Sequence, residues 1–188
     1  MSKYAVFHPD HEVLGAAVIT YRDSVNLEHY VDFYAEYGLG DVKPDQWYPF
    51  QKVLDVLSAI AERGGEMMDF VSIGMAVGAN AFLPPEFDTM PFAQIIQATG
   101  MAAGRFNRGS DFGFTTFEQL SPTHVKLDIR DPSPDDLLYG VLYGYAKRYL
   151  PSGYRFTVKY DPNTPRRELG GNSTILHVEW FPVEGANT

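Results

Sequence analysis

The stretch THVKLDIR, residues 123–130, alternates apolar and polar side chains with a period of two. The same alternation recurs in YRFTVKY, residues 154–160, and in TILHVEW, residues 174–180. It is typical of antiparallel strands that have one covered face and one face near water. We therefore expect one antiparallel sheet, and we expect the apolar residues of the first stretch to be buried, namely Val125, Leu127 and Ile129.

Two further elements complete this half of the chain. Residues 112–120 have the character of a fourth strand, joined to the next one through Ser121-Pro122. A helix is predicted over residues 134–150, where Ser133 can act as the N-cap and two aspartates favour the positive end of the helix dipole. The predicted order is therefore ββαββ. Trp180 continues the apolar face of the last strand and should be buried.

The first hundred residues carry helical signals instead. A helix is expected around residues 27–34, capped by Asp23, Ser24 or Asn26, and another begins at Trp47-Tyr48-Pro49-Phe50 and stops at Gly64-Gly65. Its buried face should hold Phe50, Val53, Leu54, Leu57 and Ile60. Trp47 should be at least half buried, as a residue that staples the first helical turn.

Two later helices follow in this half. Residues 66–81 are apolar nearly all round, which predicts a central, fully buried helix. A fourth helix should begin near Pro91 and end by Gly104. Near the start, residues 4–8 are expected to form a short strand, and residues 13–21 are either strand or helix. Together these signals predict an α+β fold in which an N-terminal helical layer packs on a four-stranded antiparallel sheet.

Composition limits the class of protein. The chain has 188 residues, close to the size of one domain, so residues 1–188 are expected to form a single domain. Its formal net charge of −9 disfavours nucleic acid and anionic membrane surfaces as partners. It has no cysteine, no secretory signal and no apolar run long enough to span a membrane. We expect a soluble cytoplasmic protein.

No motif predicts catalysis. The run His8-Pro9-Asp10-His11-Glu12 gathers possible metal ligands, but its proline prevents a regular display and a polar turn explains it equally well. Paired acids such as Asp135-Asp136 are explained by helix capping. The loop between the last two strands holds Arg166-Arg167, which could grip an anion but is more simply a mobile connection. We therefore expect no catalytic residue and no metal site.

An apolar ligand pocket is the one functional site that the pattern favours. Methionine adapts to irregular cavities, and a helical layer over a sheet can enclose an apolar pocket. Packing in the core is the alternative explanation for the same side chains. The candidate lining residues are Trp47, Phe50, Met68, Phe70, Met75 and Met101.

A homodimer is also expected. Helix 134–150 carries Tyr139, Tyr143, Tyr145 and Tyr149 around much of its circumference, so some of these rings should face outward and suit an interface. On the same helix, Gly140 and Gly144 are four residues apart and should allow close approach to the sheet or to a second copy.

The element order resembles one superfamily over about residues 13–182. It contains the haem–NO-binding (H-NOX-like) domains, the 4-vinyl reductase-type domains and the subunits of the TRAPP transport particle. The segment DDLLYGVLYG, residues 135–144, is similar to a helix there that carries a Gly-x-x-x-Gly pattern. Residues 47–50 together with Gly64-Gly65 resemble an uncharacterised myxobacterial family of the same fold.

The resemblance to haem–NO-binding domains implies an axial His in the helical layer and a Tyr-x-Ser-x-Arg signature on a following strand. Residues 40–110 contain no His, and the strand reads Lys126-Leu127-Asp128-Ile129-Arg130, so only the arginine matches. Haem is therefore disfavoured, and the cofactor stays unknown.

Three functions remain open. The preferred one is a non-enzymatic sensory domain that binds a small apolar molecule or lipid and acts on a separate effector protein. The first alternative is a protein–protein assembly module, as in the transport-particle subunits. The second is an accessory protein related to tetrapyrrole-pathway reductases.

Overall fold

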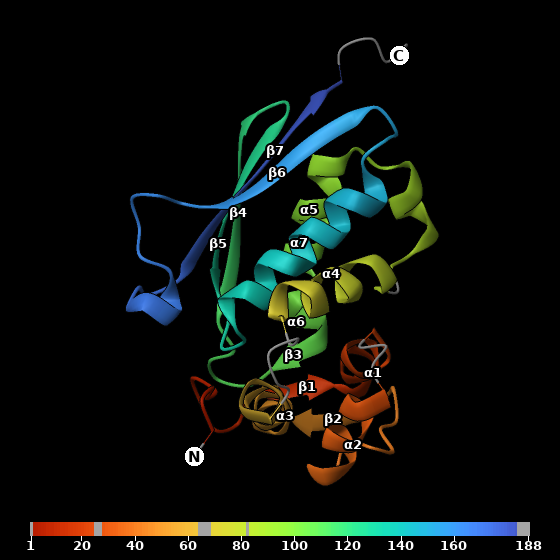
Figure 1. The fold of residues 1–188 in the computed structure, drawn as a ribbon, viewed down its shortest axis with the longest axis vertical. Helices are drawn as coiled ribbons and strands as arrows, with labels where there is room; N and C mark the ends of the chain where they lie inside the picture. The colour runs from red at the N-terminus through yellow and green to blue at the C-terminus, as the bar shows by residue number, and fades with distance from the viewer. Residues whose placement is uncertain (1, 25–27, 64–68, 82, 184–188) are drawn as a thin grey trace.

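The computed structural model describes residues 2–24, 28–63, 69–81 and 83–183. Its upper part is built on a four-stranded antiparallel sheet with the spatial order β4-β5-β7-β6 (Figure 1). One helix, α7 (Asp135–Tyr149), separates the two strand pairs along the chain, which confirms the predicted ββαββ order. The strands are β4 (Phe114–Ser121), β5 (His124–Arg130), β6 (Tyr154–Tyr160) and β7 (Thr174–Pro182).

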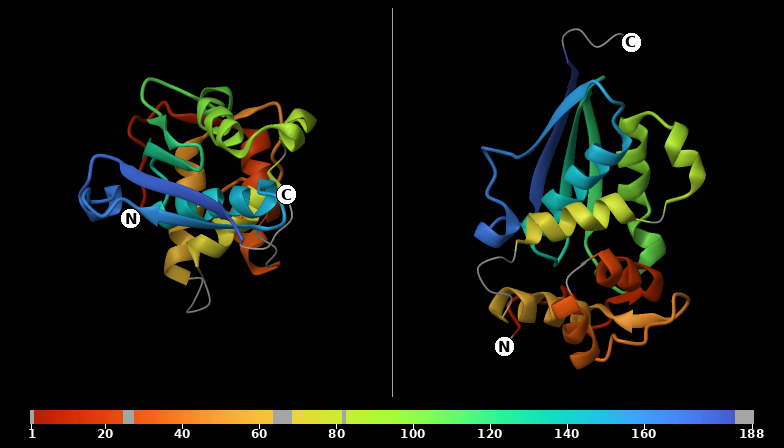
Figure 2. Two further views of the ribbon diagram at one scale, coloured as in Figure 1. Left: turned by 90° about the horizontal axis from the view of Figure 1, so that it is seen from above. Right: turned by 45° about the vertical axis from the view of Figure 1, so that its right-hand side comes forward.

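Helices cover one face of this sheet. α7 lies directly against it, and α4 (Phe70–Asn80) lies across α7 (Figure 2, right). α5 (Phe92–Met101) packs beside β4 and is followed by the short α6 (Ala103–Phe106). Two 3-10 turns, η1 (Pro85–Thr89) and η2 (Arg167–Leu169), lie in the connections. The predicted helix that begins after Pro91 is thus confirmed.

The lower part of the molecule is mainly helical. It contains α1 (Gly15–Ser24), α2 (Glu28–Glu36) and α3 (Phe50–Arg63), seen at the bottom of Figure 1. A small antiparallel sheet of order β2-β1-β3 lies among them, and its third strand comes from far along the chain. Its strands are β1 (Glu12–Leu14), β2 (Trp47–Pro49) and β3 (Asn107–Arg108).

Several local predictions for the lower part are wrong. Residues 4–8 form no strand; instead, the backbone N–H of Tyr4 donates to the Ser58 hydroxyl at 3.2 Å. Residues 13–21, for which the sequence left strand and helix open, contain both: they begin as strand and continue as helix. Residues 47–49 belong to β2 rather than to the start of a helix, which begins at Phe50. Asp23 and Ser24 belong to the last turn of α1, while Asn26 and Leu27 lie outside the described residues.

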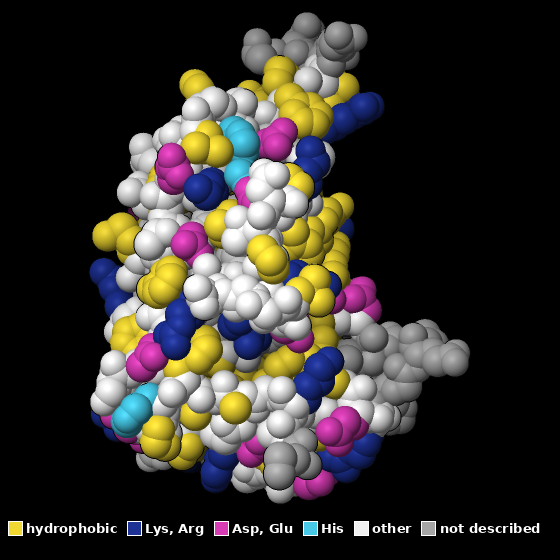
Figure 3. All heavy atoms as spheres, turned by 90° about the vertical axis from the view of Figure 1, so that its left-hand side faces the viewer, with side chains coloured by type: hydrophobic (Ala, Val, Ile, Leu, Met, Phe, Trp, Pro, Cys, Tyr) yellow, Lys and Arg dark blue, Asp and Glu magenta, His cyan; other side chains and the backbone are white. Residues whose placement is uncertain are grey.

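The inner face of the large sheet forms one hydrophobic core. The three apolar residues of β5 are buried, as predicted, with exposed fractions of 0 to 8%. Trp180 is also buried, and its ring meets Phe92 of α5 edge-on at 5.0 Å. The outward residues of β5 are all polar and only partly buried, and Figure 3 looks onto this outer face. The two faces therefore differ as the period of two predicts.

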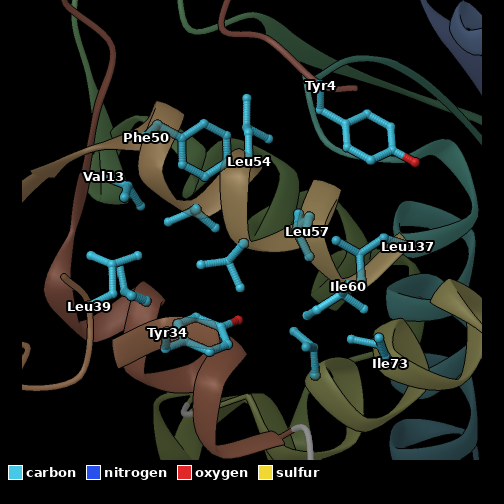
Figure 4. Close-up of a cluster of buried hydrophobic side chains, with 14 of the residues drawn as sticks. Tyr4, Val13, Tyr34, Leu39, Phe50, Leu54, Leu57, Ile60, Ile73 and Leu137 are labelled. Atoms are coloured by element: carbon cyan, nitrogen blue, oxygen red, sulfur yellow. The ribbon is translucent and has the colours of Figure 1, made fainter. Parts of the chain in front are cut away.

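A second core lies between α3 and its neighbours (Figure 4). All five residues predicted for the inner face of α3 are buried there. Ile73 of α4 and Leu137 of α7 join this core, so the two helices link the lower and upper parts. Trp47 is half-buried on β2, as expected, and packs under the guanidinium of Arg108, 4.6 Å from the ring centre.

Two predictions about helices in the upper part need correction. α4 is buried on one face only, because Val71, Met75 and Ala76 keep partial exposure; Glu66, Met67 and Met68 lie outside the described residues. Ser133 does not cap α7: the N-cap position is Pro134, and the backbone N–H of Asp135 in the first turn donates instead to the Glu168 side chain at 2.7 Å. Ser133 is buried instead.

Candidate functional site

α4 and α7 cross with their backbones in contact. A Cβ atom added to Gly74 would lie 2.2 Å from the carbonyl oxygen of Leu137, and one added to Gly140 would lie 2.2 Å from that of Val71. These distances are far below ordinary van der Waals contact, so only glycine fits. The sequence predicted close approach to the sheet or to a second copy, but the partner is α4. The residues at the crossing are Gly74, Gly78, Gly140 and Gly144.

A groove of about 370 Å³ lies beside this crossing. Because the glycines have no side chains, the two helices approach closely at the crossing. Beside the crossing, the small side chains of Ala76 and Ala79 leave the groove unfilled. Most of the surface that faces the groove is apolar, and two basic residues stand at one end of it. The lining residues are Met75, Ala76, Ala79, Gly144, Lys147 and Arg148.

The two basic residues of the groove differ in their surroundings. Arg148 donates hydrogen bonds to the carbonyl oxygens of Ala79 at 3.2 Å and Ala81 at 2.7 Å, which closes the C-terminal end of α4. Its guanidinium also lies over the Tyr149 ring. Lys147 is exposed and makes no ion pair or hydrogen bond with the described residues. The groove therefore ends at two positive charges without a carboxylate partner among the described residues, and of these Lys147 alone is free of hydrogen bonds.

Of the six residues predicted to line a pocket, Met75 lies in this groove. Met101, at the end of α5, is 75% exposed, and Met68 lies outside the described residues. Among the described methionines of this set, only Met75 lines the groove. The sequence could not separate it from Met101, because a methionine in a groove and an exposed methionine look alike in sequence. The small residues that shape the groove, Ala76 and Ala79, carried no signal of their own.

The three aromatic candidates lie in or beside the lower part. Phe50 is buried at the start of α3 and packs on the ring of His11 at 4.5 Å. Phe70 begins α4 and meets Tyr4 edge-on at 6.0 Å. Trp47 lies on β2 with Arg108. The described members of the predicted set are thus not brought together, and their role in ligand binding stays a prediction.

A smaller and more polar hollow of about 160 Å³ lies between α3 and the N-terminal segment. The Ser58 hydroxyl accepts hydrogen bonds from the backbone N–H groups of Lys3 and Tyr4 and donates to Leu54. These bonds already satisfy the central group of the hollow, so it favours no ligand. Its lining residues are Ser2, Tyr37, Asp55, Ser58, Ala59 and Glu62.

The acidic and histidine run at residues 8–12 holds two distant segments together. Asp10 accepts from the Ser110 hydroxyl at 2.6 Å, His11 pairs with the Asn107 side chain at 3.0 Å, and Glu12 accepts from Arg108 at 2.6 Å. The hydrogen bonds from Ser110 lower the pKa of Asp10 to about 2. We call the three pairs the clasp. Its three side chains point to different partners, and the described residues contain no group of three or more converging metal ligands.

The loop between β6 and β7 is tied to the start of α7. The buried Asp135 accepts from the Thr174 hydroxyl at 2.6 Å and from the backbone N–H of Glu168 at 2.9 Å. Asp136 accepts from Arg166 at 2.7 Å and from the hydroxyl of Tyr160 at 2.7 Å. Burial, then the bond to Asp136, raises the pKa of Tyr160.

These bonds bear on the arginine pair in that loop. Arg167 donates to the carbonyl oxygen of Ser133 at 2.9 Å, and Arg166 is paired with Asp136. Arg166 is therefore already paired with a carboxylate, whereas Arg167 bonds only carbonyl oxygens and its buried Nε has no partner among the described residues. Anion binding by this loop stays a prediction. The two aspartates at the start of α7 serve this attachment as well as the helix dipole.

The tyrosines of α7 also find partners inside the chain. Tyr139 packs against Tyr160 at 5.4 Å and Tyr143 against Phe156 at 4.7 Å, and all four rings are at least partly buried. Burial raises the pKa of Tyr145 to about 12. Each of the four tyrosines of α7 is partly exposed and none is fully exposed, so these rings are covered more fully than the sequence predicts. The homodimer, which rested on outward-facing rings, stays a prediction.

No known protein family matches the sequence, and neither does any curated protein. Solved structures do match the fold. An oxygen-binding H-NOX domain related to soluble guanylate cyclases has a TM-score of 0.64 and 12% identity, with 93% of this chain and 96% of that chain covered. The chain has an H-NOX-like fold.

Two further H-NOX structures agree. A variant of Tt H-NOX has a TM-score of 0.62 and 12% identity, covering 93% of this chain and 99% of that chain. An unliganded Fe(II) H-NOX protein from K. algicida has a TM-score of 0.62 and 10% identity, covering 89% and 96%. The likeness shows the fold. The resemblance to 4-vinyl reductase-type domains and TRAPP subunits finds no support. In the described part of the chain, no helix is long and apolar enough to cross a membrane.

The described residues do not fit a haem held between the helices and the sheet. His124 and His177 lie on the outer face of the sheet, away from the helical layer, and His8 is half exposed beside Asp10. His11 is buried with an unpartnered Nδ1, but its ring is enclosed by Phe50 and Phe112.

The arginine of the signature is also engaged elsewhere. Arg130 pairs with Asp111 at 2.6 Å and lies 3.7 Å from the centre of the Phe7 ring. At the positions that the resemblance assigns to haem, residues 40–110 contain no histidine for the iron, and the arginine for a propionate is already paired.

Proposed function

We propose that this protein is a non-enzymatic sensory domain that binds an elongated apolar molecule with an acidic head group in the groove beside the α4–α7 crossing. The H-NOX-like fold supports a sensory role, because the neighbouring structures belong to H-NOX domains. The observation that carries the proposal is the groove itself, which combines an apolar lining with the unpaired Lys147 at one end.

The volume and chemistry of the groove favour this ligand class. Its 370 Å³ lies in the range of small-molecule sites, which are mostly apolar with a few polar groups that fix orientation. Met75 can adapt its shape to an alkyl chain. Lys147 supplies the charge that an acidic head group needs, whereas Arg148 is occupied by the C-terminal end of α4.

The position of the groove suggests how binding could reach the rest of the molecule. It lies on the two helices that join the lower core to the upper one, since Ile73 and Leu137 belong to the lower cluster while Leu142 belongs to the upper. A ligand that changes the crossing of α4 and α7 would therefore move both parts. The output would pass to a separate effector protein.

Fluorescence titration with cis-parinaric acid tests the proposal. Ala79→Phe fills the groove and should abolish binding, while Lys147→Gln should weaken it by about tenfold because the head group loses its charge partner. Asn80→Phe is the matched control: it adds the same ring at the next, exposed position of α4, outside the groove lining. The proposal fails if the wild-type protein does not bind the probe, or if both phenylalanine variants bind it equally well.

A further inference from the structure

Two histidines face each other on the outer side of the large sheet. Nε2 of His124, on β5, lies 2.9 Å from Nδ1 of His177, on β7, and the ring centres are 5.1 Å apart. Their strands are paired antiparallel, so the two side chains project from the same face. Figure 3 shows histidine beside acidic and basic side chains in the upper half of this face.

A carboxylate fixes the proton on one of these rings. Nε2 of His177 lies 3.1 Å from Oδ2 of Asp161. A carboxylate accepts hydrogen bonds, so in this pair His177 carries its proton on Nε2. The lone pair of His177 is therefore on Nδ1 and points at His124.

A second carboxylate stands close by. Glu179 is the cross-strand partner of His124, and its Oε1 lies 4.0 Å from Nε2 of that ring. The ammonium of Lys159 is 3.8 Å from the same oxygen. Lys126 of β5, the cross-strand neighbour of His177, pairs with Glu118 at 3.3 Å. Both lysines on this face thus have acidic partners, and Glu179 needs only to exchange Lys159 for another cation.

We propose that His124 and His177 bind a divalent transition-metal ion of the zinc and copper type, with Glu179 as a third ligand and Asp161 orienting His177. Binding requires His124 to carry its proton on Nδ1 and both rings to tilt, so that the two lone pairs, which face each other across the hydrogen bond, turn toward one metal ion. Zinc–nitrogen bonds of 2.0–2.1 Å in tetrahedral geometry place two nitrogens about 3.3 Å apart, so the pair opens by a few tenths of an ångström.

The pattern of supporting groups agrees with this assignment. A metal-bound histidine commonly donates its other ring N–H to a carboxylate, which is the relation between His177 and Asp161. Imidazole nitrogens with one carboxylate suit zinc and copper, whereas calcium and magnesium require oxygen ligands. No group of three ligands is already assembled among the described residues, so binding involves a rotation of Glu179. The site is separate from the proposed groove and does not depend on it.

Metal titration of the tag-free full chain tests the proposal. Isothermal calorimetry with Zn²⁺ should show one site, and electron paramagnetic resonance with Cu²⁺ should show coupling to two nitrogens. His124→Ala and His177→Ala should each lower the affinity at least about tenfold, and Asp161→Asn should lower it by about 10–100-fold through the orientation of His177. Circular dichroism without metal checks that the variants are folded.

His8→Ala provides the matched control, because His8 also lies beside a carboxylate, at 2.6 Å from Asp10, but has no second histidine partner. The affinity of the His8→Ala variant for Zn²⁺ should equal that of the wild-type protein. The proposal is overturned if the wild-type protein binds neither Zn²⁺ nor Cu²⁺, if the folded His124→Ala and His177→Ala variants bind as tightly as the wild type, or if His8→Ala loses as much affinity as they do.

Discussion

Two consecutive helices, α3 and α4, pack in opposite ways. α3 presents large side chains, and its inner face holds residues such as Leu54, Leu57 and Ile60 that are almost fully buried. The face of α4 that contacts α7 instead carries glycines, and Gly74 and Gly78 let the two backbones touch. The first contact gains stability from apolar area removed from water, and the second from close backbone approach.

The difference shows what an apolar pattern can and cannot locate. In α3 the buried face is the apolar face, so the sequence identifies it. In α4 nearly every residue is apolar, and the contact is decided by the two positions with no side chain. The remaining apolar residues, including Met75, are left at a groove instead of in a core.

The largest expected effect comes from removing atoms in α3. Leu57→Ala should cost about 2–5 kcal/mol of unfolding free energy, because the residue is 1% exposed and a cavity remains where its side chain was. Urea denaturation measures it. Lys52→Ala, on the exposed side of the same helix, should change stability by less than about 0.5 kcal/mol. Equal stability of the two variants would contradict the packing described for α3.

In α4 the damaging change is the addition of atoms. Gly74→Ala should cost about 1–3 kcal/mol, because the new methyl group meets the backbone carbonyl of Leu137 and the helices must separate. Gly104→Ala is the control, since a Cβ there meets nothing within 4 Å and alanine favours the helix by up to about 1 kcal/mol. If thermal unfolding shows Gly74→Ala to be as stable as the control, the close backbone approach of α4 and α7 at Gly74 is contradicted.

A smaller effect is expected from acid, through the clasp that holds β1 against β3. The pKa of Asp10 is lowered to about 2 in the folded protein, from an ordinary value of 3.8 for an aspartate side chain. A depressed carboxyl pKa stabilises the fold above the unfolded value, and this contribution is lost as the pH falls from about 4 toward 2. Between pH 5 and pH 2, the wild-type protein should therefore lose more stability than Asp10→Asn.

Asp45→Asn is the control for this experiment, because Asp45 is exposed and makes no hydrogen bond with the described residues. Its pH profile should follow that of the wild type. Identical slopes for Asp10→Asn and the wild type would show that the bond between Asp10 and Ser110 does not contribute in solution.

For added haem, we expect no binding. Mixing the protein with haem should leave no stoichiometric haem on the protein after gel filtration, because the helical layer over residues 40–110 offers no histidine and Arg130 is paired with Asp111. Absorbance near the Soret band reads the result, with apo-myoglobin reconstituted in parallel. A retained, intense Soret band would require a haem site that the residue placement does not suggest.

The strands and α7 could be predicted because their patterns are local. The alternation in residues 123–130 and 174–180 specifies both the strand and its buried face. The contacts that depend on distant residues could not be found in this way. His124 and His177 are 53 positions apart, and only the register of β5 with β7 brings them together.

The candidate site was less predictable than the fold. Met75 was identified, but Ala76, Ala79 and Lys147 were not, because small residues and single lysines are common on helix surfaces. The run at residues 8–12 was interpreted as a polar turn, and its role became visible only with its partners at residues 107–110. Gly140 and Gly144 indicated close approach, yet the sequence did not reveal which element approaches.

The clasp has a consequence for how the chain reaches its native state. His11 and Asn107, which it joins, are 96 positions apart, whereas β4 and β5 are linked by a tight turn. Contacts between distant residues form slowly, because the loop between them must first be closed. During synthesis on the ribosome, β1 therefore emerges long before its partner β3 exists. The clasp of the lower part cannot form until residues 107–110 have been synthesised. The β4–β5 hairpin, in contrast, can form soon after its own residues appear.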